Sequence, residues 1–100
     1  MNEKDEWIIQ KYKEEEKMMI LLFAQWCVDH GENAVEVYQT AYPHQEVSPL
    51  LTEMLKDTVP AKESEGVQEE LLLDVLSAFG NEELAFTVAE ISSSNEKKRL

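Results

Sequence analysis

The chain has 100 residues, of which 21 are acidic and 9 are basic, and its formal net charge at pH 7 is −12. This length fits one domain. The acidic excess disfavours nucleic-acid phosphates and anionic membrane surfaces as partners, because both require clustered Lys and Arg. Three Gly, three Pro and 43% hydrophobic residues also argue against a turn-rich β fold and against disorder.

Targeting features are missing from the pattern of the sequence. Cys27 is the only cysteine, so no intramolecular disulfide can form, and this count fits a reducing compartment. The first residues are acidic, whereas a signal peptide begins with net positive charge. The most apolar segment, residues 18–28, is shorter than the roughly 20 residues that a membrane span needs. The sequence therefore predicts a cytoplasmic protein without a membrane segment.

A long helix is predicted over residues 3–30, which contain no Gly, Pro or Ser. Its apolar residues follow helical spacing. The charged stretch 13–17 interrupts this stripe, and from Met18 onward apolar residues surround most of the helix. We therefore expect an exposed first half and a buried second half. Gly31 is expected to end the helix in a left-handed conformation.

Two short helices are expected next. Asn33 and Glu36 have the spacing of a capping box, so a second helix begins at residue 34 and stops before Pro43. Ser48 followed by Pro49 is typical of an N-cap and first helical residue, so a third helix begins there and ends near Pro60.

The polar residues 60–66 form a linker, and Ser64 is a candidate cap for a fourth helix that ends at Gly80. Asn81 is expected to cap a fifth helix that ends near Ile91, and residues 92–100 are expected to form a flexible tail. The predicted fold is all-α. It is one small domain, residues 1–91, of about five helices in an irregular or orthogonal bundle with a long N-terminal helix.

Few residue combinations suggest chemistry. Cys27 and His30 could share a helix face, but a zinc site needs three or four ligands and the only other histidine is His44. The three glycines, at positions 31, 66 and 80, cannot build a phosphate-binding loop, and no nucleophile motif occurs. The sequence thus predicts no metal, no cofactor and no enzymatic activity.

An apolar cluster near the start of the long helix is the best candidate interaction patch. Trp7, Ile8, Ile9 and Tyr12 lie among charged residues on a helix end that could project from the bundle. The alternative is that they pack on the C-terminal helices. Leu73 and Phe86 fall off the main apolar faces of their helices and complete the candidate patch.

The charge is uneven along the chain: residues 1–30 carry −3 (four Lys, seven acids), residues 31–94 carry −11 (two Lys, thirteen acids) and residues 95–100 carry +2 (three bases, one acid). Solubility explains such an acidic layer, and attraction to a basic partner is the alternative. The general look is that of a small bacterial protein. The leading hypothesis is a non-enzymatic protein–protein interaction module that self-associates through its first helix. The alternatives are an acidic decoy for a basic nucleic-acid-binding protein and a small enzyme or small-molecule binder.

Overall fold

A computed structural model describes the backbone of residues 3–99 and the side chains of residues 6–96. This part of the chain is all-α and contains no strand, which confirms the predicted fold class. The elements in chain order are α1 (Glu3–Asp29), α2 (Ala34–Ala41), α3 (Pro49–Leu55), the short 3₁₀ helix η1 (Ala61–Glu63), α4 (Glu69–Ala78) and α5 (Glu82–Arg99).

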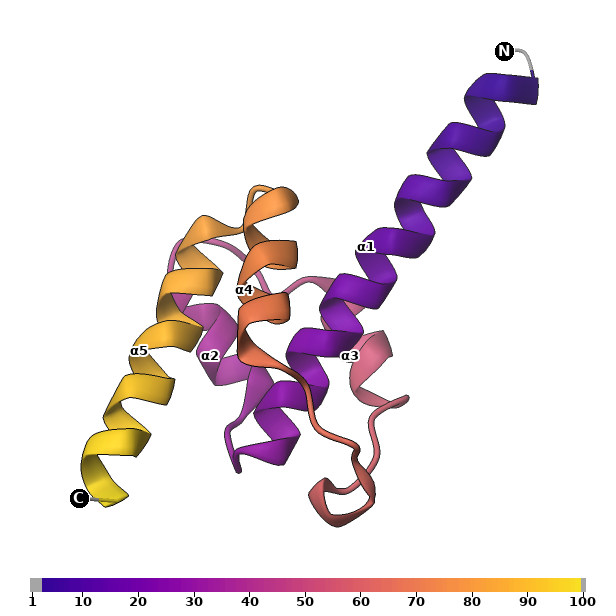
Figure 1. Cartoon of the computed structure of the whole chain (residues 1–100). Helices are drawn as coiled ribbons and strands as arrows, with labels where there is room; N and C mark the ends of the chain where they lie inside the picture. The colour runs from indigo at the N-terminus through magenta and orange to yellow at the C-terminus, as the bar shows by residue number, and fades with distance from the viewer. Residues whose placement is uncertain (1–2, 100) are drawn as a thin grey trace.

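The long helix α1 organises the molecule (Figure 1). Its C-terminal half contacts α2, α3, α4 and η1, whereas its N-terminal half extends beyond all of them. The hairpin of α4 and α5 covers one side, and α2 packs against α5. The start of α1 and the end of α5 therefore lie at opposite ends of the molecule, whose longest dimension is 56 Å.

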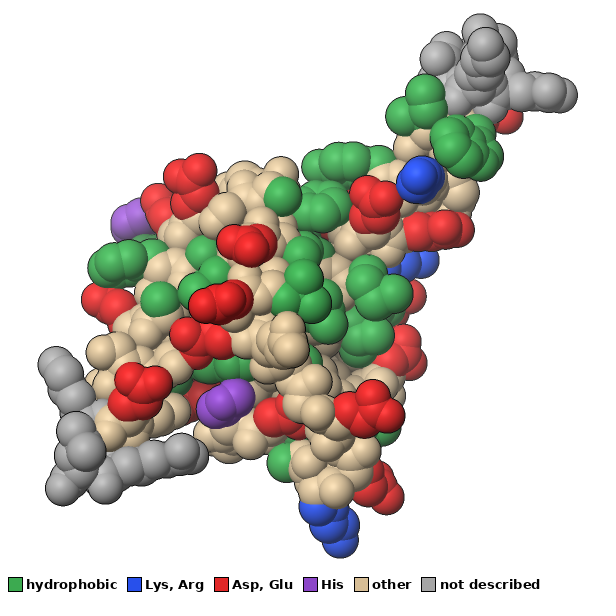
Figure 2. Space-filling view, in the orientation of Figure 1, with side chains coloured by type: hydrophobic (Ala, Val, Ile, Leu, Met, Phe, Trp, Pro, Cys, Tyr) green, Lys and Arg blue, Asp and Glu red, His purple; other side chains and the backbone are tan. Residues whose placement is uncertain are grey.

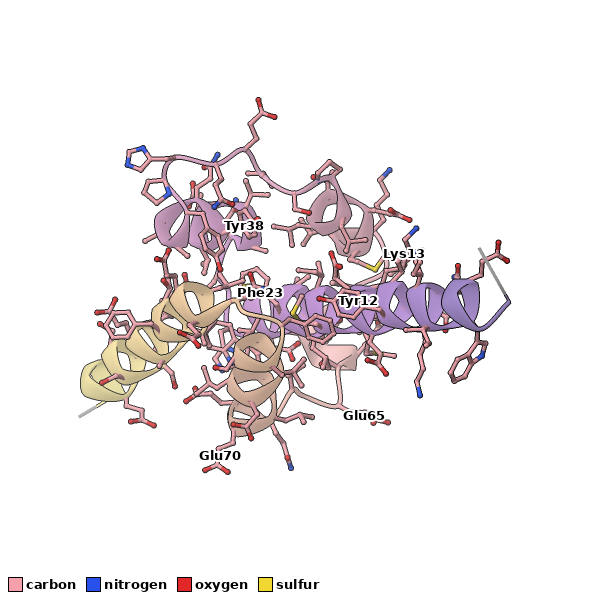
Figure 3. The ribbon with its side chains drawn as sticks, turned by 90° about the horizontal axis from the view of Figure 1, so that it is seen from above. Tyr12, Lys13, Phe23, Tyr38, Glu65 and Glu70 are labelled. Atoms are coloured by element: carbon pink, nitrogen blue, oxygen red, sulfur yellow. The ribbon has the colours of Figure 1, made fainter. Side chains whose placement is uncertain are left out.

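The core is built around the second half of α1, as its apolar circumference predicts. Phe23, Trp26 and Cys27 have no exposed surface, and Phe23 lies where the helices meet (Figure 3). Each of the other four α-helices adds two or three buried side chains to this cluster. Fully burying one large apolar side chain stabilises a fold by about 1.5–3 kcal/mol, so this half of α1 holds the bundle together. The buried apolar residues are Met19, Ile20, Phe23, Ala24, Trp26, Cys27, Ala34, Val37, Ala41, Leu51, Met54, Leu72, Leu76, Leu84, Ala85 and Val88.

Several helix ends lie where the capping residues and glycines of the sequence predict them. Gly31 and Gly80 follow α1 and α4 with φ of 68° and 79°, a conformation that is unfavourable for residues with a Cβ. The Asn33 side chain accepts a hydrogen bond from the backbone N–H of Glu36 at 3.1 Å, and α2 begins directly after Asn33, at Ala34. Ser48 caps α3 in the same way, with Pro49 at its first position.

The connection between α3 and α4 differs from the prediction. Helix α3 ends at Leu55 and α4 begins only at Glu69, so Ser64 does not cap α4. Side chains of α1 hold this connection instead. The Gln25 amide donates to the Val59 carbonyl and accepts from the Val59 N–H, both at 2.9 Å, and the Ser64 hydroxyl donates to Asp29 at 2.9 Å.

The end of α5 is also corrected. The predicted helix end at Ile91 is wrong, because α5 continues through residues 92–99. This stretch contains no Gly or Pro to stop a helix, and residues 96–99 are Glu, Lys, Lys and Arg, which are good helix formers. Basic residues at the last turn are favoured further by the helix dipole. Leu100 lies outside the described residues, and flexibility of residues 92–100 stays a prediction.

Candidate interaction surface

The first half of α1 forms an arm, defined here as residues 6–18, that projects from the bundle (Figure 1). Its apolar side chains are largely in solvent: the exposed fractions are 64% for Trp7, 58% for Ile8, 43% for Ile9 and 54% for Tyr12. The space-filling view shows green hydrophobic side chains along this projecting part of the molecule (Figure 2). Four of the six predicted patch residues therefore lie together, and Trp7 does not pack on the C-terminal helices.

The arm continues the core-facing side of α1. Residues 9, 12, 16, 19, 23 and 26 follow each other at alternating spacings of three and four, which is one face of a helix. Met19, Phe23 and Trp26 are buried in the bundle, while Ile9 and Tyr12 on the same face are largely exposed, and Tyr12 meets only the edge of the bundle at Phe79. The same apolar face thus changes from core to surface near Glu16, which is half-buried.

The base of the arm is fixed to the bundle. The rings of Tyr12 and Phe79 lie 5.2 Å apart, which joins the arm to the end of α4. A hollow of about 230 Å³ at this junction is lined by Tyr12 and Glu16 from α1 and by Tyr38, Ser48, Phe79 and Asn81, among other residues. Asn81 links three segments here, since its amide donates to the Met19 sulfur at 3.4 Å and its oxygen accepts from the Tyr42 hydroxyl at 2.9 Å. The arm is therefore held in a defined direction.

Charged side chains border the apolar side chains of the arm. The Lys11 ammonium lies 5.4 Å from the centroid of the Trp7 ring, within the range of a cation–π contact. Trp7, Ile8 and Tyr12 line one shallow hollow together with Lys11 and Glu15. The surface is therefore amphipathic, with an apolar strip between long charged side chains.

The two remaining patch residues lie elsewhere. The expected exposure of Leu73 is wrong, because Leu73 is half-buried and packs against the core, whereas Leu71 on the predicted apolar face is 49% exposed. The positions of α1 and α5 beside α4 decide which of these leucines is covered. Phe86 is 65% exposed, as predicted, but it lies near the start of α5 and not on the arm.

Phe86 lines a groove between α2 and α5 that was not predicted from the sequence. This α2–α5 groove has a volume of about 400 Å³ and is lined by Thr40, Ala41, Glu82, Glu83, Phe86, Thr87 and Glu90. Residues 83, 86, 87 and 90 have the spacing of one helix face, which was visible in the sequence. Their position next to the end of α2 depends on tertiary packing.

The Cys27 and His30 side chains take structural positions. Burial, followed by the nearby Glu32 charge, raises the pKa of the Cys27 thiol to about 12, so the thiol stays protonated near neutral pH. The His30 ring stacks on Trp26 with centroids 4.4 Å apart, and its Nδ1 lies 2.8 Å from the Trp26 carbonyl oxygen. Among the side chains of residues 6–96, no group of three or more His, Cys, Asp or Glu is placed to hold a metal ion.

The fold and these surfaces define a small, acidic, all-α protein with a projecting amphipathic helix. In the described part of the chain, no helix combines the length and apolar character required for a membrane span. The chain belongs to the YxiS family, whose model matches residues 1–93. It is 39% identical over 98 residues to the uncharacterized protein YxiS of Bacillus subtilis (strain 168), and the match covers 97% of this chain and 100% of that protein. No solved structure matches the chain.

Proposed function

We propose that this protein is a non-enzymatic, cytoplasmic protein–protein interaction module that self-associates through the arm of α1. The observation that carries the proposal is the exposed apolar strip of Ile8, Ile9 and Tyr12, with Trp7 at its edge, on a helix that extends away from its own bundle. Exposed apolar clusters of this kind mark interaction sites in proteins.

A second copy is the partner that the arm fits most directly. Two identical arms related by a twofold axis present the same apolar strip to each other, so each strip can cover the other. Ile9 and Tyr12 in this strip continue a face that already packs against helices inside the bundle, where Met19, Phe23 and Trp26 are buried. The arm is short, so the dimer interface is small, and we expect association in the micromolar range.

Features of the cysteine and of the charge support the rest of the proposal. The protonated, fully buried Cys27 is unsuited to act as a nucleophile. A single cysteine fits a reducing compartment such as the cytoplasm. The net charge of −12 disfavours nucleic acid as the partner.

Light scattering coupled to size exclusion, from about 5 to 200 μM protein, tests self-association over the range that such an interface implies. We expect the mass to rise toward that of a dimer with concentration. Because apolar contacts drive the association and salt screens the repulsion between two acidic chains, added salt should preserve or strengthen the dimer.

The double variant Ile8→Ser/Ile9→Ser should remain a monomer over the whole concentration range. The matched control, Val59→Ser/Leu71→Ser, removes two apolar side chains of similar exposure from other surfaces and should still dimerise. A monomeric wild type at the highest concentration, or a dimer that persists in the arm variant, rejects the proposal.

A further inference from the structure

The α2–α5 groove is an interaction surface separate from the arm. Its floor consists of Ala41 and Thr87, each 8% exposed, and the 65% exposed Phe86 ring forms a wall. A volume of about 400 Å³ is enough for one or two side chains. An apolar hollow of this size on the surface of the bundle offers burial to a side chain of another molecule.

The hydroxyl groups in the groove already have partners. The Thr40 hydroxyl donates to the Glu36 carbonyl and the Thr87 hydroxyl donates to the Glu83 carbonyl, each at 2.9 Å. These bonds lie within α2 and within α5, so neither hydroxyl requires a ligand. The polar groups left in the groove lining are the carboxylates of Glu82, Glu83 and Glu90.

The segments that line the groove carry no basic residue. Neither α2 nor residues 82–96 of α5 contains a lysine or an arginine. The three glutamates therefore surround the apolar floor with negative charge, which attracts a cation and repels acidic segments. On the face drawn in Figure 2, red side chains predominate over α4 and α5, in contrast to the mixed red and blue of the arm.

From this combination we infer that the α2–α5 groove binds an arginine-containing basic segment of a partner protein. The aliphatic part of an arginine side chain packs on Ala41 and Phe86. Its guanidinium group stacks on the aromatic ring and donates paired hydrogen bonds to carboxylates. Lysine has the charge but lacks the planar group that does both at once, so the groove favours arginine.

The groove and the arm are distinguishable because the groove is lined by residues of α2 and α5, whereas the arm is the projecting first half of α1. The arm association is apolar and tolerates salt, whereas an exposed groove lined by carboxylates depends on charge that salt screens. Binding to the groove does not require the dimer. The two proposals can therefore fail independently.

The test uses a short acetylated and amidated peptide that contains the sequence Arg-Leu-Arg, with matched Lys-Leu-Lys and Gln-Leu-Gln versions. Titration into dilute ¹⁵N-labelled protein reports both affinity and location through the amide chemical shifts. We expect the shifts to centre on residues 40–41 and 82–90. The arginine peptide should bind most tightly, the lysine peptide more weakly and the glutamine peptide not measurably, and raising NaCl from 50 to 500 mM should weaken binding.

Variants separate the groove from general acidity. Glu83→Gln/Glu90→Gln should weaken arginine-peptide binding about tenfold, and Phe86→Ala should weaken it about fivefold. The matched control, Glu53→Gln/Glu70→Gln, removes the same charge from exposed positions on α3 and α4 and should bind as the wild type does. Glu70 points away from the bundle (Figure 3). The exposed positions of all these side chains keep the variants folded, which circular dichroism verifies.

Three results would overturn the inference. The first is shift changes spread over the acidic surface. The second is an equal loss of affinity in the control variant. The third is an equal affinity for the arginine and lysine peptides.

Discussion

The two halves of α1 place the same kinds of side chain in opposite environments. Trp26 is completely buried in the bundle, whereas Trp7, on the same continuous helix, is 64% exposed. The buried half has α2, α3 and α4 around it, while the arm has extended past them. The comparison shows that apolar residues at helical spacing indicate a helix face that packs against another surface. They do not indicate whether that surface belongs to the same chain or to another molecule.

Truncation of Trp26 and of Trp7 to alanine should give the largest difference in stability between the two halves of α1. Trp26→Ala leaves a cavity in the centre of the core and should lower the free energy of unfolding by about 3–5 kcal/mol. Trp7→Ala removes the same side chain from the arm and should change the free energy of unfolding of the monomer by less than about 0.5 kcal/mol. Urea denaturation followed by circular dichroism at low protein concentration measures both.

A similar cost for the two variants would contradict the comparison. It would mean that the arm packs on the bundle in solution.

The second largest effect concerns the buried half of α1 and should appear in the pH dependence of the free energy of unfolding. Cys27 has a folded pKa near 12 because burial disfavours the thiolate, and an unfolded thiol ionises near pH 9. The folded state therefore keeps its thiol proton while the unfolded state loses it. The stabilisation is complete below pH 9 and is lost as the pH rises toward 12, by about 2 kcal/mol at pH 10.5.

Denaturation of the wild type and of Cys27→Ala between pH 8 and 11 isolates this contribution. The stability difference between the two proteins should shrink or change sign as the pH rises, because the alanine variant lacks the titrating group. A constant difference would show that the thiol ionises in the folded state as readily as in the unfolded state.

The smallest expected difference in stability between the two halves of α1 comes from two glutamines. Gln25 holds both backbone groups of Val59 at 2.9 Å, whereas Gln10 on the arm makes one long contact of 3.5 Å to Glu14. Gln25→Ala should cost about 1 kcal/mol, and Gln10→Ala should cost almost nothing.

Hydrogen exchange at the amide of Val59 gives a more local measurement. It should speed up in Gln25→Ala and stay unchanged in Gln10→Ala. Unchanged protection in both variants would show that the connection between α3 and α4 does not depend on its contact with α1.

Features that depend on contacts between neighbouring residues could be predicted from the sequence. The cap of α2 by Asn33, the start of α3 at Ser48 and Pro49, and the turns at Gly31 and Gly80 all rest on contacts within a few residues. The all-α class and the central position of the second half of α1 follow from composition and apolar spacing, and both were predicted. The exposure of Trp7, Ile8, Ile9 and Tyr12 was one of two alternatives that the sequence left open, and the structure shows these four side chains exposed.

Tertiary packing decided the features that depend on distant residues. Leu71 and Leu73 are equally apolar, and only the directions of the helices beside α4 determine that Leu73 is covered and Leu71 is exposed. Gln25 interrupts an apolar run in the sequence, yet it binds Val59, which is 34 residues away. The α2–α5 groove exists because Ala41 and Phe86 are brought together by the fold. Contacts of this kind join segments that no local pattern relates, so they became visible only when the helices were assembled.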